Sequence, residues 1–139
     1  VLSGAPRAQC EQLREFGLNL GIAFQIIDDV LDYEGDPNTM GKNLGDDLAE
    51  GKPTLPLIHA LRHAKTEDAA IIKQAITSRD SSELDSIVRI IKECGSLDYA
   101  RDQANRYRTK ADTALALLSE SQHKSELLGL SEKAVARAA

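Results

Sequence analysis

A run of aspartates on one face of a long helical segment constrains this chain more than any other feature. Apolar residues recur with helical period over about 6–33, which predicts one long helix there. At about 100° per residue, one stripe of this helix carries Gln25 and the carboxylates of Asp28, Asp29 and Asp32. The opposite side carries the residues we expect to be buried, namely Leu20, Ala23, Phe24, Ile27, Val30 and Leu31.

Three neighbouring carboxylates require a compensating cation. Like charges a few ångströms apart repel by roughly 1 kcal/mol per pair in water and by more near a protein interior. Oxygen ligands with no His or Cys nearby are typical of Mg²⁺, which binds a few carboxylates together with water and substrate phosphates. The pattern therefore favours a magnesium site for phosphate chemistry. The alternative interpretation is the solvated face of an ordinary amphipathic helix.

The segment after this helix adds positive charge. Residues 36–38, Asp-Pro-Asn, break the helix, and Lys42 and Lys52 each follow a glycine directly. Lysines on such loops bind phosphates as point charges, although an isolated Gly-Lys pair is ordinarily a solvated turn. An EF-hand calcium loop does not fit, because its fifth position would be Met40 and its twelfth Asp47 in place of the required glutamate.

Residues 17–61 resemble the trans-isoprenyl diphosphate synthases, in particular the long-chain polyprenyl branch and its bacterial octaprenyl members. The matching text is GLNLGIAFQIIDDVLDYEGDPNTMGKNLGDDLAEGKPTLPLIHAL. It joins the family's second aspartate-rich motif to its Gly-Lys and Gly-Lys-Pro-Thr-Leu-Pro segments in the same order and spacing. A looser match continues over the whole chain, and residues 94–118 resemble the helix that follows the family's Gly-Ser break.

The resemblance implies an all-α helical bundle, the C-terminal portion of the isoprenoid synthase fold, as a single domain over 1–139. It also implies a homodimeric prenyltransferase. Such an enzyme elongates an allylic diphosphate, for example farnesyl diphosphate, with isopentenyl diphosphate to an all-trans octaprenyl diphosphate for quinone side chains. Mg²⁺ and lysines would stabilise the departing pyrophosphate, which is where negative charge develops in this reaction.

The resemblance further implies roles for individual residues. Asp28 corresponds to the direct metal ligand, with Asp29 and Asp32 in support. The expected metal set is Asp28, Asp29, Asp32 and Asp47, and the expected substrate-binding set is Lys42, Lys52, Gln25 and Phe24. The expected catalytic set is Asp28, Asp29, Asp32, Lys42 and Gln25.

Two glycines precede the aspartates on the same side of the helix. Gly17 and Gly21 lie two turns and one turn before the acidic stripe and leave room for a narrow cavity beside it. We hypothesise that Gly21 makes room for substrate. The alternative is a close helix crossing through small residues.

The family's first aspartate-rich motif, with its paired arginines, has no counterpart in this sequence. The chain also begins at Val1, and its single methionine is Met40. We therefore expect a C-terminal fragment that is inactive by itself. Two other hypotheses are a non-catalytic regulatory subunit of a heteromeric prenyl synthase and an acidic bundle with a structural Mg²⁺.

The composition of the chain limits which partners and which cellular compartment we expect. A net charge of −5 with 4% aromatic residues argues against a nucleic-acid partner. No apolar run reaches the ~18 residues of a membrane span, so we expect a cytoplasmic protein with at most peripheral membrane contact. Cys10 and Cys94 lack metal-ligand spacing and are expected to be reduced. His59 and His63 have a spacing that can bind zinc but lack a third ligand, which favours surface histidines.

The remaining segments also show helical period. A short helix is expected around 57–61, another from Thr66, and a third that Ser82 begins and Gly95 ends. Ser96 then opens a long helix with an alanine-rich stripe suited to close antiparallel packing. A terminal helix follows, in which Gly129 is expected to weaken or bend the chain.

Overall fold

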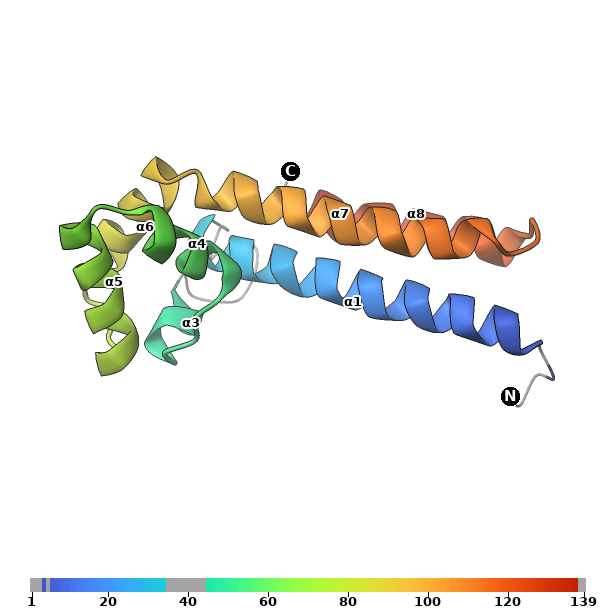
Figure 1. Ribbon diagram of the computed structural model, residues 1–139, viewed down its shortest axis with the longest axis horizontal. Coiled ribbons are helices and arrows are strands. Elements are labelled where there is room, and N and C mark those ends of the chain that lie inside the picture. Colours follow the sequence, from blue (N-terminus) through green and yellow to red (C-terminus); the bar gives the residue numbers. More distant parts are fainter. Residues whose placement is uncertain (1–3, 5, 35–44, 138–139) are drawn as a thin grey trace. The chain divides into compact units, whose positions relative to one another are not determined.

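The computed structural model describes residues 4, 6–34 and 45–137, and every regular element among them is a helix (Figure 1). The helices are α1 (Arg7–Glu34), α3 (Asp46–Ala49), α4 (Leu55–His63), α5 (Thr66–Ser78), α6 (Leu84–Glu93), α7 (Ser96–Ala116) and α8 (Gln122–Ala136). The all-α prediction is confirmed. None of the helices in the described part of the chain is long and apolar enough to cross a membrane.

The chain divides into two compact units. The first unit comprises Val1–Ile27 and Asp102–Ala139, and the second comprises Asp28–Arg101. The boundary falls inside α1 and inside α7, so both long helices contribute to each unit. A single domain over the whole chain stays a prediction.

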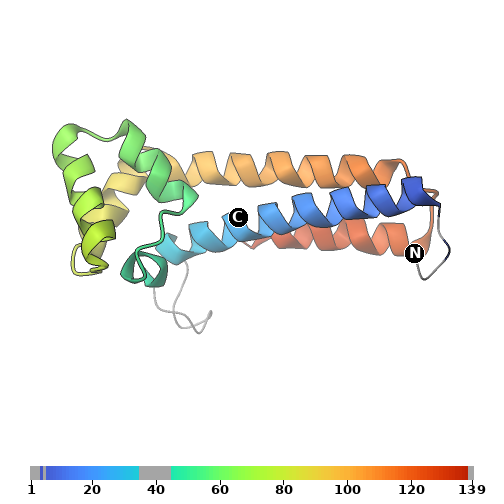
Figure 2. The same ribbon diagram turned by 60° about the horizontal axis from the view of Figure 1, so that its bottom comes forward.

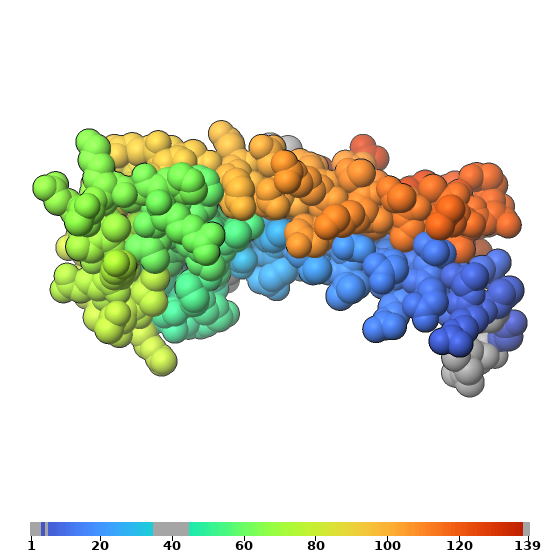
Figure 3. All heavy atoms as spheres, in the orientation of Figure 1, coloured from blue at the N-terminus to red at the C-terminus, as the bar shows by residue number. Residues whose placement is uncertain are grey.

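The first unit packs three helices side by side, with α7 antiparallel to both α1 and α8 (Figures 1 and 2). Its core contains Phe16 of α1 and the α7 residues Ala111, Ala114 and Leu115. Small alanines let the neighbouring helices approach closely, as the alanine stripe predicted. Figure 3 shows that side chains fill the space between the α1 and α7 ribbons of this unit. Gly129 lies within α8, which runs from Gln122 to Ala136, and a weakening or bending effect of this glycine stays a prediction.

The second unit contains the end of α1, the shorter helices and the start of α7. Helices α4, α5 and α6 contact one another, and α3 contacts α5. Its fully buried apolar side chains include Leu48, Leu57, Ile72, Ile87 and Ile91. Burial of such side chains stabilises a fold by about 1.5–3 kcal/mol each.

The start of α6 differs from the sequence prediction. The Ser82 hydroxyl donates to Asp80 at 2.8 Å, and the Ser82 backbone N–H donates to the same carboxylate at 2.9 Å. Ser82 therefore belongs to a turn held by Asp80, and Glu83 takes the N-cap position one residue later. The predicted end is confirmed, because Gly95 follows the helix with a φ of +66°.

Candidate metal and diphosphate site

The three predicted carboxylates occupy the last two turns of α1. Asp28 and Asp29 are half-buried, whereas Asp32 is only 1% exposed. A solvated helix face would leave all three side chains in water, so that interpretation is wrong for Asp32. Asp32 instead lies in the interior of the second unit.

Asp32 connects the end of α1 to α3. Its carboxylate Oδ2 accepts the backbone N–H of Asp47 at 3.3 Å. Its backbone carbonyl accepts the N–H of Gly45 at 2.9 Å. A hydrogen bond to an ionised acceptor contributes more than a neutral one, about 1.5–3 kcal/mol. Asp32 thus holds the segment that carries Asp47 against the acidic end of α1.

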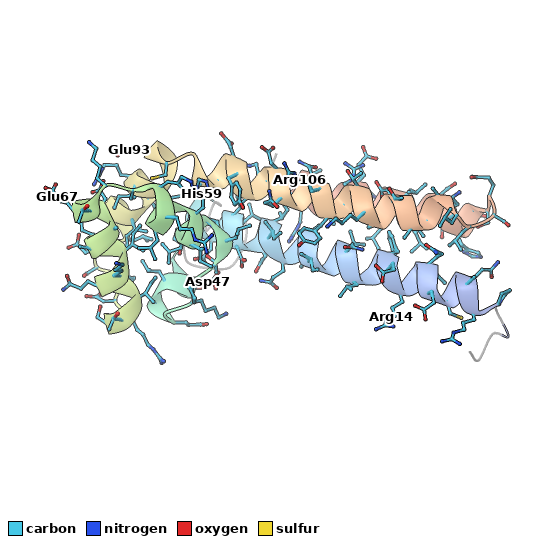
Figure 4. All side chains as sticks on the ribbon, viewed as in Figure 1. Arg14, Asp47, His59, Glu67, Glu93 and Arg106 are labelled. Atoms are coloured by element: carbon cyan, nitrogen blue, oxygen red, sulfur yellow. The ribbon has the colours of Figure 1, made fainter. Side chains whose placement is uncertain are left out.

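Asp47 and Lys52 form an ion pair beside this junction. Asp47, labelled in Figure 4, is 7% exposed, and its Oδ1 lies 3.6 Å from Lys52 Nζ. Lys52 Nζ also lies 3.0 Å from Glu50 Oε2. The hydrogen bond to Glu50 and the charges of Glu50 and Asp47 raise the pKa of Lys52. Its side chain is 57% exposed, so a protonated ammonium is available to an anion from solvent.

The turn before Lys52 depends on Gly51. Gly51 has a φ of +73°, and a Cβ at this position would lie 3.1 Å from the Ile76 carbonyl oxygen and 3.0 Å from Arg79 Cγ. A side chain would therefore meet both backbone strain and the end of α5. The Gly-Lys motif indicated the lysine as a candidate. The close approach of Gly51 to α5 could not be predicted from the spacing of residues in the sequence.

Tyr33 is a second residue that the sequence did not single out. It is 1% exposed and directly follows Asp32 on α1. Burial raises its pKa strongly, and the negative charge of Asp32 raises it further. Its phenol is therefore neutral and cannot add to the negative charge of the site.

Phe24 and Gln25 precede Asp28 along α1 and belong to the first unit. Both are exposed, and Phe24 is 46% exposed. Placing Phe24 on the buried face was wrong. The buried stripe of α1 centres on Ala23, Ile27 and Val30, and Phe24 lies beyond its edge, where α8 covers the ring only in part.

A groove lies beside the two helix glycines, within the first unit. Its volume is about 530 Å³, and its lining includes Gly17, Gly21 and Phe24 of α1 with Leu130 and Ala134 of α8 and the Arg137 that follows this helix. A Cβ on either glycine would meet nothing within 4 Å. Among the described residues no helix crosses closely at these glycines, and a groove lies beside them; that Gly21 makes room there for substrate stays a prediction.

The remaining candidates have different outcomes. Lys42 lies outside the described residues. Among the residues that are described, no three His, Cys, Asp or Glu side chains group closely enough to hold a metal ion. The donors at the end of α1 nevertheless suit Mg²⁺, because Asp28 and Asp29 offer half-exposed carboxylate oxygens and Mg²⁺ takes its other ligands from water and phosphate.

The histidine pair forms a stack. The ring centroids of His59 and His63 are 4.1 Å apart, and those of His59 and Tyr99 are 4.2 Å apart. His59 Nδ1 shares a 2.9 Å hydrogen bond with the buried Ser96 hydroxyl, and His63 Nδ1 donates to the His59 carbonyl at 2.8 Å. His63 is exposed as expected, and His59 is half-buried.

Comparison with known proteins identifies the family. Residues 1–94 match the polyprenyl synthetase family. The chain belongs to this family. Octaprenyl diphosphate synthase from Haemophilus influenzae is 45% identical over 138 residues, which are 99% of this chain and 42% of the relative. The enzyme of the same name from Escherichia coli is 41% identical, over 99% of this chain and 43% of the relative. The chain thus spans about two fifths of these polyprenyl synthetases.

Solved structures of the family have the same fold. Polyprenyl synthase from Caulobacter crescentus, complexed with calcium and isoprenyl diphosphate, matches with a TM-score of 0.89 and 40% identity over 98% of this chain and 42% of that one. Geranylgeranyl pyrophosphate synthase from Corynebacterium glutamicum, complexed with isoprenyl diphosphate and magnesium, matches with a TM-score of 0.86 and 27% identity over 96% of this chain and 39% of that one. The isoprenoid synthase fold predicted from the resemblance is confirmed.

Proposed function

We propose that this chain supplies the second aspartate-rich motif and the diphosphate-binding lysines of a trans-polyprenyl diphosphate synthase. The complete enzyme would elongate an allylic diphosphate with isopentenyl diphosphate to an octaprenyl diphosphate. One observation carries the proposal. The acidic end of α1 is bonded through Asp32 to the segment that presents Asp47 and the exposed Lys52. Membership of the polyprenyl synthetase family supports it.

The site offers oxygen ligands for Mg²⁺. Asp28 and Asp29 would hold the ion, while Asp32 and Asp47 hold the surrounding backbone and contribute negative charge. When bound, Mg²⁺ neutralises the negative charge that develops on departing pyrophosphate. The calcium and magnesium in the Caulobacter and Corynebacterium complexes support a divalent ion here.

The cationic and apolar residues would receive the two ends of the substrate. Lys52 and Lys42 would bind the diphosphate, and Gln25 and Phe24 would line the reaction centre. The carbon–oxygen bond of the allylic diphosphate breaks, the isopentenyl double bond attacks the freed carbon, and a proton leaves to form the new double bond. No protein nucleophile is needed, so electrostatic stabilisation by the side chains is sufficient.

Several finer predictions accompany this function. The chain by itself would be inactive, and the enzyme would be a cytoplasmic homodimer with at most peripheral membrane contact. A second candidate is a non-catalytic regulatory subunit of a heteromeric prenyl synthase. Such a subunit has no chemical need for the aspartates and lysines together. A measurement of pyrophosphate binding therefore distinguishes the prenyltransferase from the regulatory subunit.

Calorimetry with inorganic pyrophosphate tests the proposal. We expect the chain to bind pyrophosphate in a Mg²⁺-dependent manner, and Lys52→Ala to weaken binding about tenfold, as the loss of one charged hydrogen bond should. Lys73→Ala, at an exposed position on α5, is the matched control and should bind as the wild type does. Pyrophosphate binding that depends neither on Mg²⁺ nor on Lys52 would contradict the proposal and favour the regulatory subunit.

A further inference from the structure

Arg137, the residue that ends α8, makes two contacts with Phe24 of α1. Its guanidinium carbon lies 3.9 Å from the centroid of the Phe24 ring. Its Nη2 donates to the backbone carbonyl of Phe24 at 3.3 Å. All of these atoms belong to the first unit. One cation therefore holds both the ring and the backbone of the same residue.

Arg137 is itself anchored before it reaches α1. Its Nε donates to the carbonyl of Ala134 at 3.3 Å, one of the carbonyls that the end of α8 leaves without a helical partner. A cation at a helix C-terminus also interacts favourably with the helix dipole. The planar guanidinium can bond to Ala134, stack on the ring and bond to Phe24 at once, which the single ammonium of a lysine cannot do.

Phe24 needs such an anchor because α1 does not bury it. The ring is 46% exposed and lines the groove beside Gly21. An exposed side chain samples several rotamers unless a specific contact selects one. Arg137 provides that contact on the side of the ring that faces α8.

We propose that Arg137 is a positioning residue for prenyl transfer, acting through Phe24. It selects one orientation of the ring and fixes the backbone of α1 directly before Gln25. The inference rests on the proposed function, in which Phe24 and Gln25 line the reaction centre. Arg137 itself contacts neither substrate nor metal in this role.

The contact can be tested without an activity assay. The chain has two phenylalanines, Phe16 and Phe24, so ring signals of phenylalanine-labelled protein are readily assigned by NMR. We expect Arg137→Ala to shift the Phe24 ring signals and leave those of Phe16 in place, because Phe16 is in the core. Lys133→Ala removes the same charge from a residue one turn earlier in the same groove and should shift neither ring substantially. Unchanged Phe24 signals in Arg137→Ala would overturn the proposal.

Kinetics of the enzyme that carries this chain test the positioning role. We expect Arg137→Ala to lower kcat about two- to fivefold, the effect of losing one exposed cation–π contact, with little change in the KM for isopentenyl diphosphate. Arg137→Lys should restore part of kcat, and Lys92→Ala, at an exposed position on α6 outside the groove, should match the wild type. A raised KM with unchanged kcat would overturn the proposal, because it would indicate direct binding of substrate.

The two proposals fail in different ways. If the wild-type enzyme transfers prenyl groups and Arg137→Ala has normal kcat, only the role of Arg137 is overturned. If the wild-type enzyme shows no prenyl transfer, the proposed function is overturned and the role of Arg137 with it.

Discussion

The carboxylate of Asp32 accepts the backbone N–H of Asp47 at 3.3 Å, across a sequence separation of fifteen residues. The first residue belongs to the helix with the aspartate-rich motif, and the second to α3. The contact makes Asp32 different from its neighbours Asp28 and Asp29, which are half-buried. Asp32 therefore holds the backbone that carries Asp47.

Replacing Asp32 should therefore cost stability. Asp32→Ala leaves the buried N–H of Asp47 without its acceptor, and we expect the free energy of unfolding to fall by about 2 kcal/mol. Asp85→Ala, at an exposed position on α6, should change it by less than about 1 kcal/mol. Urea denaturation of both variants measures the difference, and equal losses would contradict the structural role of Asp32.

Alanine substitutions at Gly51 and Gly95 should distinguish the cost of backbone strain from the cost of steric contact. Both have positive φ, +73° and +66°, but a Cβ on Gly95 would meet nothing within 4 Å. Gly95→Ala should lower the free energy of unfolding by about 1–2 kcal/mol through strain alone. Gly51→Ala should cost at least about 1 kcal/mol more, because its Cβ would press on the Ile76 carbonyl. Denaturation curves that ranked the two variants equally would rule out the steric contribution.

Substitutions at Gly21 should affect the turnover of the enzyme and the stability of the fold to different extents. Gly21→Ala adds a methyl group in open space and should raise the free energy of unfolding by up to about 1 kcal/mol through helix propensity. Gly21→Leu fills part of the groove and should depress turnover of the complete enzyme far more than it affects stability. Gly129→Leu, on α8, is the control, since a Cβ there also meets nothing within 4 Å. Equal losses of activity and stability in Gly21→Leu would contradict the groove's role.

The His59 stack should make stability depend on pH. Burial lowers the pKa of His59 from its ordinary value of 6.5, and the charge of His63 lowers it further. A proton therefore binds the unfolded chain more readily than the folded one. Stability is complete above about pH 6.5 and declines as the pH falls below it. Thermal unfolding between pH 7.5 and pH 5 should show this decline in the wild type and in His123→Gln, but less of it in His59→Gln. A decline of the same size in all three would assign the dependence to other groups.

The sequence by itself was sufficient for the elements and for the family. Helical periodicity and the break at Gly95 are local properties, because a helix forms from hydrogen bonds between residues four apart. The order and spacing of the aspartates and Gly-Lys segments can be read directly from the amino-acid sequence. That is why the long α1, the all-α class and the polyprenyl synthetase family were all predicted correctly.

Only the tertiary structure decided which side chains are buried. We expected Asp32 on the polar side and Phe24 on the apolar side of the helix, whereas Asp32 is buried and Phe24 is exposed. Asp32 is buried at its junction with α3, which begins fourteen residues later, and Phe24 stays exposed although Arg137, at the end of α8, lies over its ring. These contacts join residues far apart in sequence, and periodicity within one helix contains no information about them.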